Sequence, residues 1–167
     1  MTVRKAVRED LARIHFIYDR ARELMRASGN PTQWGDSYPP KELTESDVEG
    51  GLLYVIEARD LPDQKPEIYG VFAFFPSGDA IFNNIEGKWL NNSPHSAIHR
   101  VASSGERRGI LSACVEFCLS LSSNLKIDTH PDNKIMQHQL AKAGFAFCGT
   151  ITMPDGSPRL CYQRCDD

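Results

Sequence analysis

The stretch Ser103-Ser104-Gly105-Glu106-Arg107-Arg108-Gly109-Ile110-Leu111-Ser112-Ala113-Cys114 joins a short loop of small residues and arginines to an apolar helical pattern. The β-type run Ala97 to Ala102 precedes it, so the order is strand, glycine-containing turn and helix start. A helix start presents unpaired N–H groups and the positive end of the helix dipole, so two arginines there are electrostatically misplaced unless an anion binds among them. The stretch therefore predicts a phosphate site. An ordinary turn with solvated arginines fits the local sequence equally well.

Composition is that of an ordinary globular protein. The 167 residues are 41% hydrophobic and 25% charged, and we expect a single domain over residues 1–167. A formal net charge of −3 disfavours a dedicated nucleic-acid binder and favours small-molecule partners. The first residues lack an apolar signal core and no apolar run approaches the length of a membrane span, so we expect a cytoplasmic protein with no membrane partner. The sequence does not decide the oligomeric state and leaves a homodimer open.

The five cysteines are an odd number without any Cys-x-x-Cys pair, which predicts neither a disulfide framework nor a familiar zinc site. Cys114 and Cys118 lie four residues apart on one helical face, where core packing is favoured over metal binding. We therefore expect free thiols and no metal site.

Hydrophobic periodicity predicts the order of the elements. Strands are expected at 3–6, 52–58, 68–75, 97–102, 125–128, 145–151 and 160–163, with a weaker one at 80–82. Helices are expected at 11–25, 42–48, 109–122 and 132–142, and the segment 83–95 is expected to be irregular. Because the early strands follow one another as meanders and the later ones are joined through helices, the predicted class is mixed α/β with a largely antiparallel sheet.

Two motifs in this order carry a family resemblance. The first is the strand, loop and helix start from Ile98 to Ser112. The second is Ile127-Asp128-Thr129-His130-Pro131-Asp132-Asn133-Lys134-Ile135-Met136 followed by Leu140-Ala141-Lys142-Ala143-Gly144-Phe145. Together they resemble the GCN5-related N-acetyltransferase (GNAT) superfamily, and most of all small bacterial acetyltransferases with an Ile-His-Arg-Val-Ala-Ser-Ser strand. The resemblance covers nearly the whole chain. It implies a mixed, mostly antiparallel sheet that is splayed at the cofactor site and flanked by helices, and it implies acetyl-CoA as cosubstrate.

The resemblance also implies which residues hold acetyl-CoA. The backbone of Val101 and Ala102 is expected to contact the thioester end, and Arg107 and Arg108 are expected to add positive charge. The pyrophosphate is expected at the helix start, which consists of Gly109, Ile110, Leu111 and Ser112. Asn133 either hydrogen-bonds the pantetheine arm or caps the next helix.

The chain departs from the family pattern at two leucines. Leu111 stands where a small residue usually leaves room for a backbone to approach the pyrophosphate. Leu140 stands where a tyrosine often protonates the departing thiolate. A thiolate with a pKa of roughly 8.5 does not strictly require a strong acid, so catalysis is still compatible with Leu140. His138 is a weak substitute because it is expected to face solvent.

Acetyl transfer to an amine needs a proton acceptor, because an alkyl ammonium with a pKa of about 10.4 is rarely neutral at pH 7. His99 is one candidate, provided that alternation along the strand puts Ile98 and Arg100 on the opposite face. The alternative for His99 is a core histidine bonded to a carbonyl. Glu86 is the second candidate, and a solvated loop carboxylate is its alternative reading.

An aromatic loop between the first two helices is expected to form part of the acceptor pocket, because this loop closes over the acceptor in the superfamily. Trp34 and Tyr38 lie on it, and Phe82 is expected to line the same cavity. Simple hydrophobic packing of a long loop is the alternative.

The function implied by the resemblance is an N-acetyltransferase that moves an acetyl group from acetyl-CoA to a primary amine of a small molecule or protein, by direct attack in a ternary complex. Two other readings stay open. Leu111 and Leu140 favour a non-catalytic acyl-CoA-binding or sensing module on the same fold. The Gly-Arg turn alone is also compatible with an unrelated α/β domain that binds another phosphate ligand.

Overall fold

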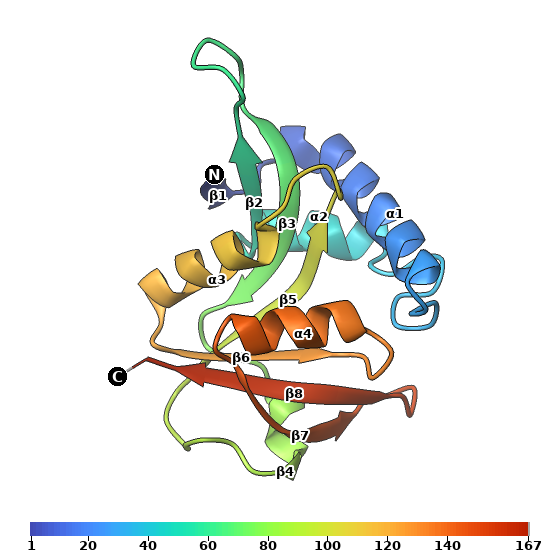
Figure 1. Ribbon diagram of the computed structural model, residues 1–167, viewed down its shortest axis with the longest axis vertical. Coiled ribbons are helices and arrows are strands. Elements are labelled where there is room, and N and C mark those ends of the chain that lie inside the picture. Colours follow the sequence, from blue (N-terminus) through green and yellow to red (C-terminus); the bar gives the residue numbers. More distant parts are fainter. Residues whose placement is uncertain (167) are drawn as a thin grey trace.

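One eight-stranded sheet, in the order β1-β2-β3-β5-β6-β8-β7-β4, organises the computed structural model, which describes residues 1–166 (Figure 1). The strands are β1 (Thr2–Lys5), β2 (Leu53–Ala58), β3 (Glu67–Phe75), β4 (Glu86–Gly87), β5 (Ser96–Ser103), β6 (Asn124–Thr129), β7 (Ala146–Thr152) and β8 (Pro158–Cys165). The helices are α1 (Leu11–Ala27), α2 (Lys41–Glu49), α3 (Ile110–Leu121) and α4 (Lys134–Lys142), with short 3-10 turns η1 (Arg8–Asp10) and η2 (Ala80–Asn84). Neighbouring strands pair antiparallel except β5 and β6, which are parallel. The predicted mixed class with a mostly antiparallel sheet is confirmed.

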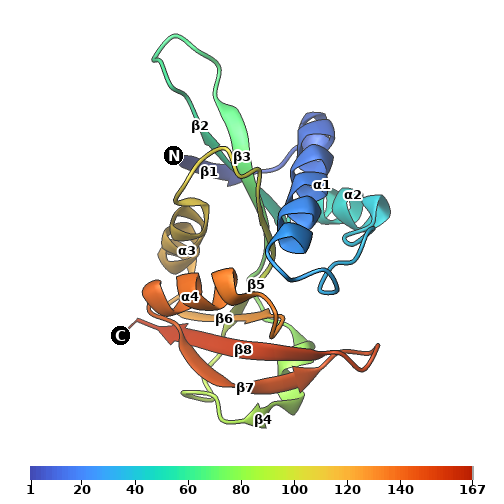
Figure 2. The same ribbon diagram turned by 45° about the vertical axis from the view of Figure 1, so that its right-hand side comes forward.

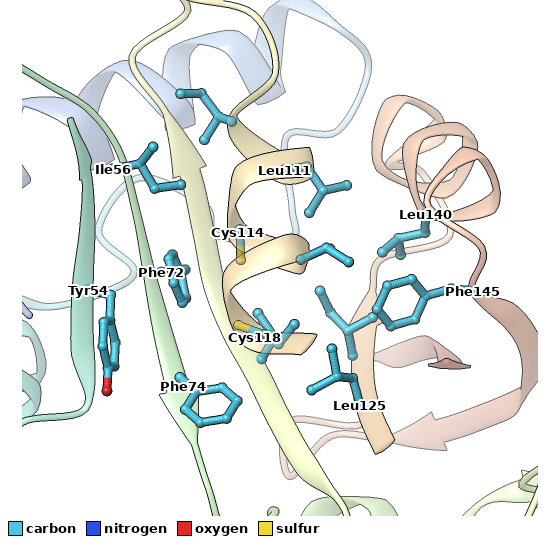
Figure 3. Close-up of a cluster of buried hydrophobic side chains, with 14 of the residues drawn as sticks. Tyr54, Ile56, Phe72, Phe74, Leu111, Cys114, Cys118, Leu125, Leu140 and Phe145 are labelled. Carbon is cyan, nitrogen blue, oxygen red and sulfur yellow. The ribbon is translucent and has the colours of Figure 1, made fainter. Parts of the chain in front are cut away.

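Helices cover both faces of the sheet. Figure 2 shows α1 and α2 on one side of β1, β2, β3 and β5, with α3 on the other side. The largest apolar cluster lies between the sheet and helices α3 and α4 (Figure 3). Cys114 and Cys118 are buried in this cluster as free thiols, which confirms their predicted packing role. A second cluster lies between the sheet and α1, where Ile14 and Ile17 are fully buried.

Helix α3 lies unusually close to β3 at its first residue. A Cβ atom added at Gly70 would lie 2.4 Å from Cγ2 of Ile110. Gly70 therefore sets how near the start of α3 can approach the sheet.

The prediction of a strand at residues 80–82 is wrong, because this segment belongs to the 3-10 turn η2. The side chain of Asp79 accepts a hydrogen bond from the backbone N–H of Ile81 at 3.0 Å, which starts a turn instead of an extended strand. The segment expected to be irregular also contains the two-residue strand β4, which pairs with β7. No helix among residues 1–166 is long and apolar enough to cross a membrane.

Candidate functional site

A bulge in β5 determines the shape of the site. Between their paired positions, β3 has one residue after Val71, whereas β5 has two, Arg100 and Val101. Arg100 has a φ of 52°. This left-handed conformation is uncommon for residues other than glycine and costs about 1–3 kcal/mol.

Just before this bulge, β5 and β6 separate. Their parallel pairing ends at Ile98 and Ile127, and the residues that follow, His99 and Asp128, are not paired with one another. In Figure 1, β5 runs upward from this point while β6 runs across the view. The predicted splaying of the sheet is therefore confirmed, and it leaves backbone groups of β5 without partners from β6.

A cavity of about 940 Å³ lies on the α3 and α4 side of this separation. We call it the first cavity. It is bounded by β5, the start of α3, the end of α1 and helix α4. It is lined by every residue that the resemblance assigned to acetyl-CoA: Val101, Ala102, Arg107, Arg108, Gly109, Ile110, Leu111, Ser112 and Asn133. Its size is that of a typical ligand cavity.

The start of α3 forms one end of the first cavity, and its charge suits an anion. Gly109 precedes the helix with a φ of 84°, and Ala113 is the first residue to donate a helical hydrogen bond, to the carbonyl of Gly109 at 3.0 Å. Within residues 1–166, the N–H groups of Ile110, Leu111 and Ser112 have no acceptor. Unpaired N–H groups and the helix dipole together favour a phosphate.

The two arginines of the motif have different surroundings. Arg107 forms an ion pair with Asp60, and its guanidinium lies 4.8 Å from the centre of the Tyr69 ring. Arg108 is exposed and has no ion pair with any residue from 1 to 166. Arg108 is therefore the arginine whose charge is available to a ligand of the first cavity.

The two leucines that depart from the family pattern are core residues. Figure 3 shows Leu111, Leu140 and Phe145 directed toward one another between α3 and α4. Leu111 also forms part of the cavity wall, whereas Leu140 is fully buried and lines neither cavity described here. The position of the usual tyrosine therefore supplies packing and no proton donor. His138 is exposed, as expected.

Asn133 connects α4 to the aromatic loop. Its side-chain oxygen accepts a hydrogen bond from the backbone N–H of Met136 at 3.0 Å, so Asn133 does cap the helix. Its amide nitrogen donates to Oε1 of Gln33 at 3.0 Å.

A second cavity, of about 560 Å³, lies on the other side of the β5–β6 separation. Trp34 and Tyr38 line it, so the structure brings the predicted acceptor residues to one place. The loop that carries them is packed on α1, since the Trp34 ring lies edge-on to Tyr18 with centroids 5.6 Å apart. The first and second cavities share four wall residues: Met25, Val101, Asn133 and Met136.

His99 lines the second cavity between two carboxylates. Its Nε2 lies 3.0 Å from Oδ2 of Asp79, although the N–H direction departs from an aligned hydrogen bond, and its Nδ1 lies 3.7 Å from Oδ1 of Asp128. The ring stacks on Phe82 with centroids 5.7 Å apart and an interplanar angle of 8°. The ring therefore faces carboxylates, and not the carbonyl that its alternative reading required.

The two carboxylates respond differently to this environment. Contact with His99 holds the pKa of Asp79 below its usual value. Burial raises the pKa of Asp128, while the charges of His99 and Arg159 oppose that rise. Asp79 and Asp128 were both missed as site residues in the sequence. Asp128 lies inside the second motif, one residue beyond the end of the pairing between β6 and β5, and a carboxylate within this strand motif was the signal that could have identified it.

Arg100 does not lie on the face opposite His99, as simple alternation would have it, because the bulge brings both residues to the second cavity. The Nη2 atom of Arg100 lies 2.7 Å from Oδ2 of Asp47, and both side chains are buried. Burial lowers the pKa of Arg100, but the Asp47 charge outweighs this and raises it. Arg100 therefore stays a paired cation in the cavity wall.

The structure does not bring Glu86 or Phe82 to the cavity lining. Glu86 lies exposed on β4 at the edge of the sheet, opposite Thr150 of β7, and lines neither cavity. Phe82 is buried behind His99 and supports that ring, while its neighbour Ile81 reaches the cavity surface.

The sequence matches no family model and no curated protein. Solved structures match over almost the full chain. A GNAT-family acetyltransferase from Streptococcus agalactiae is 25% identical with a TM-score of 0.86, covering 99% of this chain and 95% of that one. Arabidopsis thaliana NAA60, solved with a bisubstrate analogue, is 14% identical with a TM-score of 0.63, covering 98% and 97%. The protein yncA from Salmonella typhimurium, solved with its cofactor acetyl-CoA, is 14% identical with a TM-score of 0.59, covering 99% and 94%.

These matches confirm the resemblance indicated by the two sequence motifs. The chain has the fold of the GNAT acetyltransferases.

Proposed function

We propose that this protein is an N-acetyltransferase that moves an acetyl group from acetyl-CoA to a primary amine, by direct attack while both substrates are bound. The observation that carries the proposal is that the first and second cavities meet at the separated ends of β5 and β6. A donor in one cavity and an acceptor in the other would face each other across this opening. The acetyl-CoA bound to the Salmonella relative supports the identity of the donor.

The residues of the first cavity fit the chemical groups of acetyl-CoA. The unpaired N–H groups at the start of α3 and the side chain of Arg108 suit the phosphates. The apolar side chains of Met25, Ile135 and Met136 suit the thin pantetheine arm. Backbone groups of Val101 and Ala102, which β6 does not pair, suit the thioester end.

When bound, acetyl-CoA supplies an acetyl carbon whose bond to sulfur is readily broken. The chain itself holds the two reactants in one orientation, which accounts for much of the rate enhancement in such reactions. The cluster of Asp79, His99 and Asp128 supplies a proton acceptor on the side where the amine enters. Because Leu140 is buried, water is expected to protonate the leaving thiolate.

Direct transfer is favoured because no thiol is placed to carry the acetyl group. Cys114, Cys118, Cys148, Cys161 and Cys165 all lie outside the residues that line the two cavities.

Release of free CoA from acetyl-CoA, measured with a panel of small primary amines and lysine-containing peptides, tests this function. We expect at least one amine to raise CoA release well above the hydrolysis background. Binding of acetyl-CoA without turnover on any amine would contradict the proposal.

That outcome would support the second candidate, a non-catalytic acyl-CoA-binding module. The buried Leu140, in place of the usual proton donor, is the observation that favours it. If the protein does not bind acetyl-CoA but does bind other phosphate compounds, both candidate functions are contradicted.

A further inference from the structure

Three side chains lie in a row with His99 in the middle and Asp79 and Asp128 on either side. Their surroundings differ, and so do the roles that they can have. Asp79 lies at the entrance of η2, His99 on β5 and Asp128 at the end of β6. All three line the second cavity.

Asp79 has both of its oxygen atoms committed. Oδ1 accepts a hydrogen bond from the backbone N–H of Ile81 at 3.0 Å, and Oδ2 lies 3.0 Å from Nε2 of His99. Nε2 is buried and has no other partner among residues 1–166. A carboxylate next to a buried ring nitrogen favours the tautomer in which that nitrogen carries the proton.

The plane of the His99 ring is also fixed. Phe82 stacks on one face, and Phe75 lies edge-on with centroids 5.0 Å apart. With Nε2 carrying the proton, the lone pair lies on Nδ1, which faces Asp128.

Asp128 has the opposite character from Asp79. Its side chain is 13% exposed and accepts no hydrogen bond from any side chain within residues 1–166. Its two nearest charged partners, Nδ1 of His99 at 3.7 Å and Nε of Arg159 at 3.9 Å, are both beyond hydrogen-bond distance. Arg159 is tied elsewhere, since it donates to Ser157 and to the carbonyl of Pro158. The Asp128 carboxylate therefore has unused acceptor capacity beside the Nδ1 atom of His99.

We propose that the acceptor binds as a primary ammonium anchored by Asp128, an inference that rests on the proposed function. Nδ1 of His99 then takes a proton from this ammonium. Asp79 is a positioning residue for His99. The proton leaves nitrogen for Nδ1, and the neutral amine forms a bond to the acetyl carbon. The carbon–sulfur bond breaks with its electron pair going to sulfur, and the second proton lost from nitrogen ends on the thiolate. The products are the acetylated amine and free CoA, and His99 returns its proton to solvent.

Other groups near Asp128 are compatible with this division. Four groups face it: His99 from β5, Asp79 from the entrance of η2, and Arg159 and Cys161 from β8. Burial raises the pKa of Cys161 to about 12, so this thiol is neutral. Arg159 is then the one fixed cation of the four, and an incoming ammonium supplies the charge that offsets Asp79 and Asp128.

The tautomer of His99 is tested by ¹⁵N–¹H spectra of protein labelled at its histidines, with the His99 signals assigned from the H99Q variant. We expect neutral His99 to carry its proton on Nε2. In Asp79→Asn, Oδ1 can still cap η2 while an amide nitrogen faces the ring, so the proton is expected to move to Nδ1. Asp155→Asn is the matched control, because Asp155 lines the same cavity but has no ion pair with His99. An unchanged tautomer in Asp79→Asn, or a proton on Nδ1 in the parent protein, would overturn the role of Asp79.

Steady-state kinetics with an acceptor from the amine panel separates the three roles. Asp79→Asn is expected to lower kcat by about 10²-fold with little change in KM for the amine. Asp128→Asn is expected to raise that KM by roughly 10- to 100-fold, because a charged hydrogen-bond partner is lost. A lower kcat at constant KM for Asp128→Asn would overturn its role as the anchor. If no amine supports turnover, the proposed function and the anchor fail together, while the spectra still decide the role of Asp79.

Discussion

Asp128 is a mostly buried carboxylate to which no other side chain within residues 1–166 donates a hydrogen bond, and this combination affects the stability of the folded protein. Burial raises the pKa of Asp128 above the ordinary value of 3.8 in the folded protein. The folded state then binds this proton more tightly than the unfolded state does. The free energy of unfolding therefore falls as pH rises from 3.8 through the folded pKa, and the deficit persists above that window.

Asp128→Asn removes this charge with little change in shape. We expect the variant to melt at a higher temperature than the parent at pH 7, by about 2–4 °C for each kcal/mol relieved. The gain should shrink as pH falls through the folded pKa and disappear below 3.8, where the parent carboxyl is protonated in both states. Thermal unfolding followed by circular dichroism across this pH range checks the expectation. A lower melting temperature at pH 7 would show that contacts with His99 and Arg159 outweigh the burial of charge.

At the scale of elements, the distance between β3 and α3 determines where the start of α3 lies in the first cavity, the place proposed for the phosphates. Gly70 leaves no room for a Cβ, because that atom would lie 2.4 Å from Cγ2 of Ile110. Ile110 is the first residue of α3, so any shift that relieves this contact moves the N–H groups proposed to hold the phosphates.

Gly70→Ala is therefore expected to lower the free energy of unfolding by about 1–3 kcal/mol and to weaken acetyl-CoA binding as well. Gly50→Ala is the control, because Gly50 follows α2 with an ordinary φ of −74° and lies outside both cavities, and a Cβ there would meet only the carbonyl oxygen of Ser46 closely, at 3.2 Å. Denaturant unfolding and calorimetric titration measure the two effects. Unchanged acetyl-CoA affinity in Gly70→Ala would show that the position of α3 is not limiting.

The order of elements could be predicted from the sequence because it depends on local patterns. Apolar periodicity marked the helices, and dense β-type runs marked β2, β3 and β5. No strand forms at 80–82, because the side chain of Asp79 caps the 3-10 turn η2. This hydrogen bond outweighs the β-type pattern of the three residues. In each of these cases the deciding interaction spans only a few residues.

The candidate site was harder to predict because it depends on contacts between distant segments. The two motifs placed the first cavity, since its residues adjoin one another along the chain. The bulge that brings Arg100 to the same cavity as His99 depends on the pairing of β5 with β3, which alternation alone does not reveal. Glu86 stood out as a loop carboxylate, yet pairing of β4 with β7 carries it to the sheet edge. Asp79 joins the site only because η2 packs against β5.

At the scale of the whole molecule, the first and second cavities lie on opposite sides of the separation between β5 and β6 and meet there. The proposed function has both substrates bound before transfer, because no cysteine lines either cavity to hold the acetyl group between two half-reactions. Initial rates measured against both substrates are expected to give intersecting double-reciprocal lines. Parallel lines would indicate an acetylated form of the protein and would contradict direct transfer.

Acetyl-CoA is proposed to bind at the opening between β5 and β6, with its phosphates at the start of α3. Isothermal titration calorimetry of the full chain with acetyl-CoA tests it most directly, with Arg108→Gln measured alongside. The expected result is saturable binding of one acetyl-CoA per chain, weakened by about tenfold, or 1.4 kcal/mol, in Arg108→Gln. No detectable binding to the parent protein, or binding that is equally tight in Arg108→Gln, would contradict it.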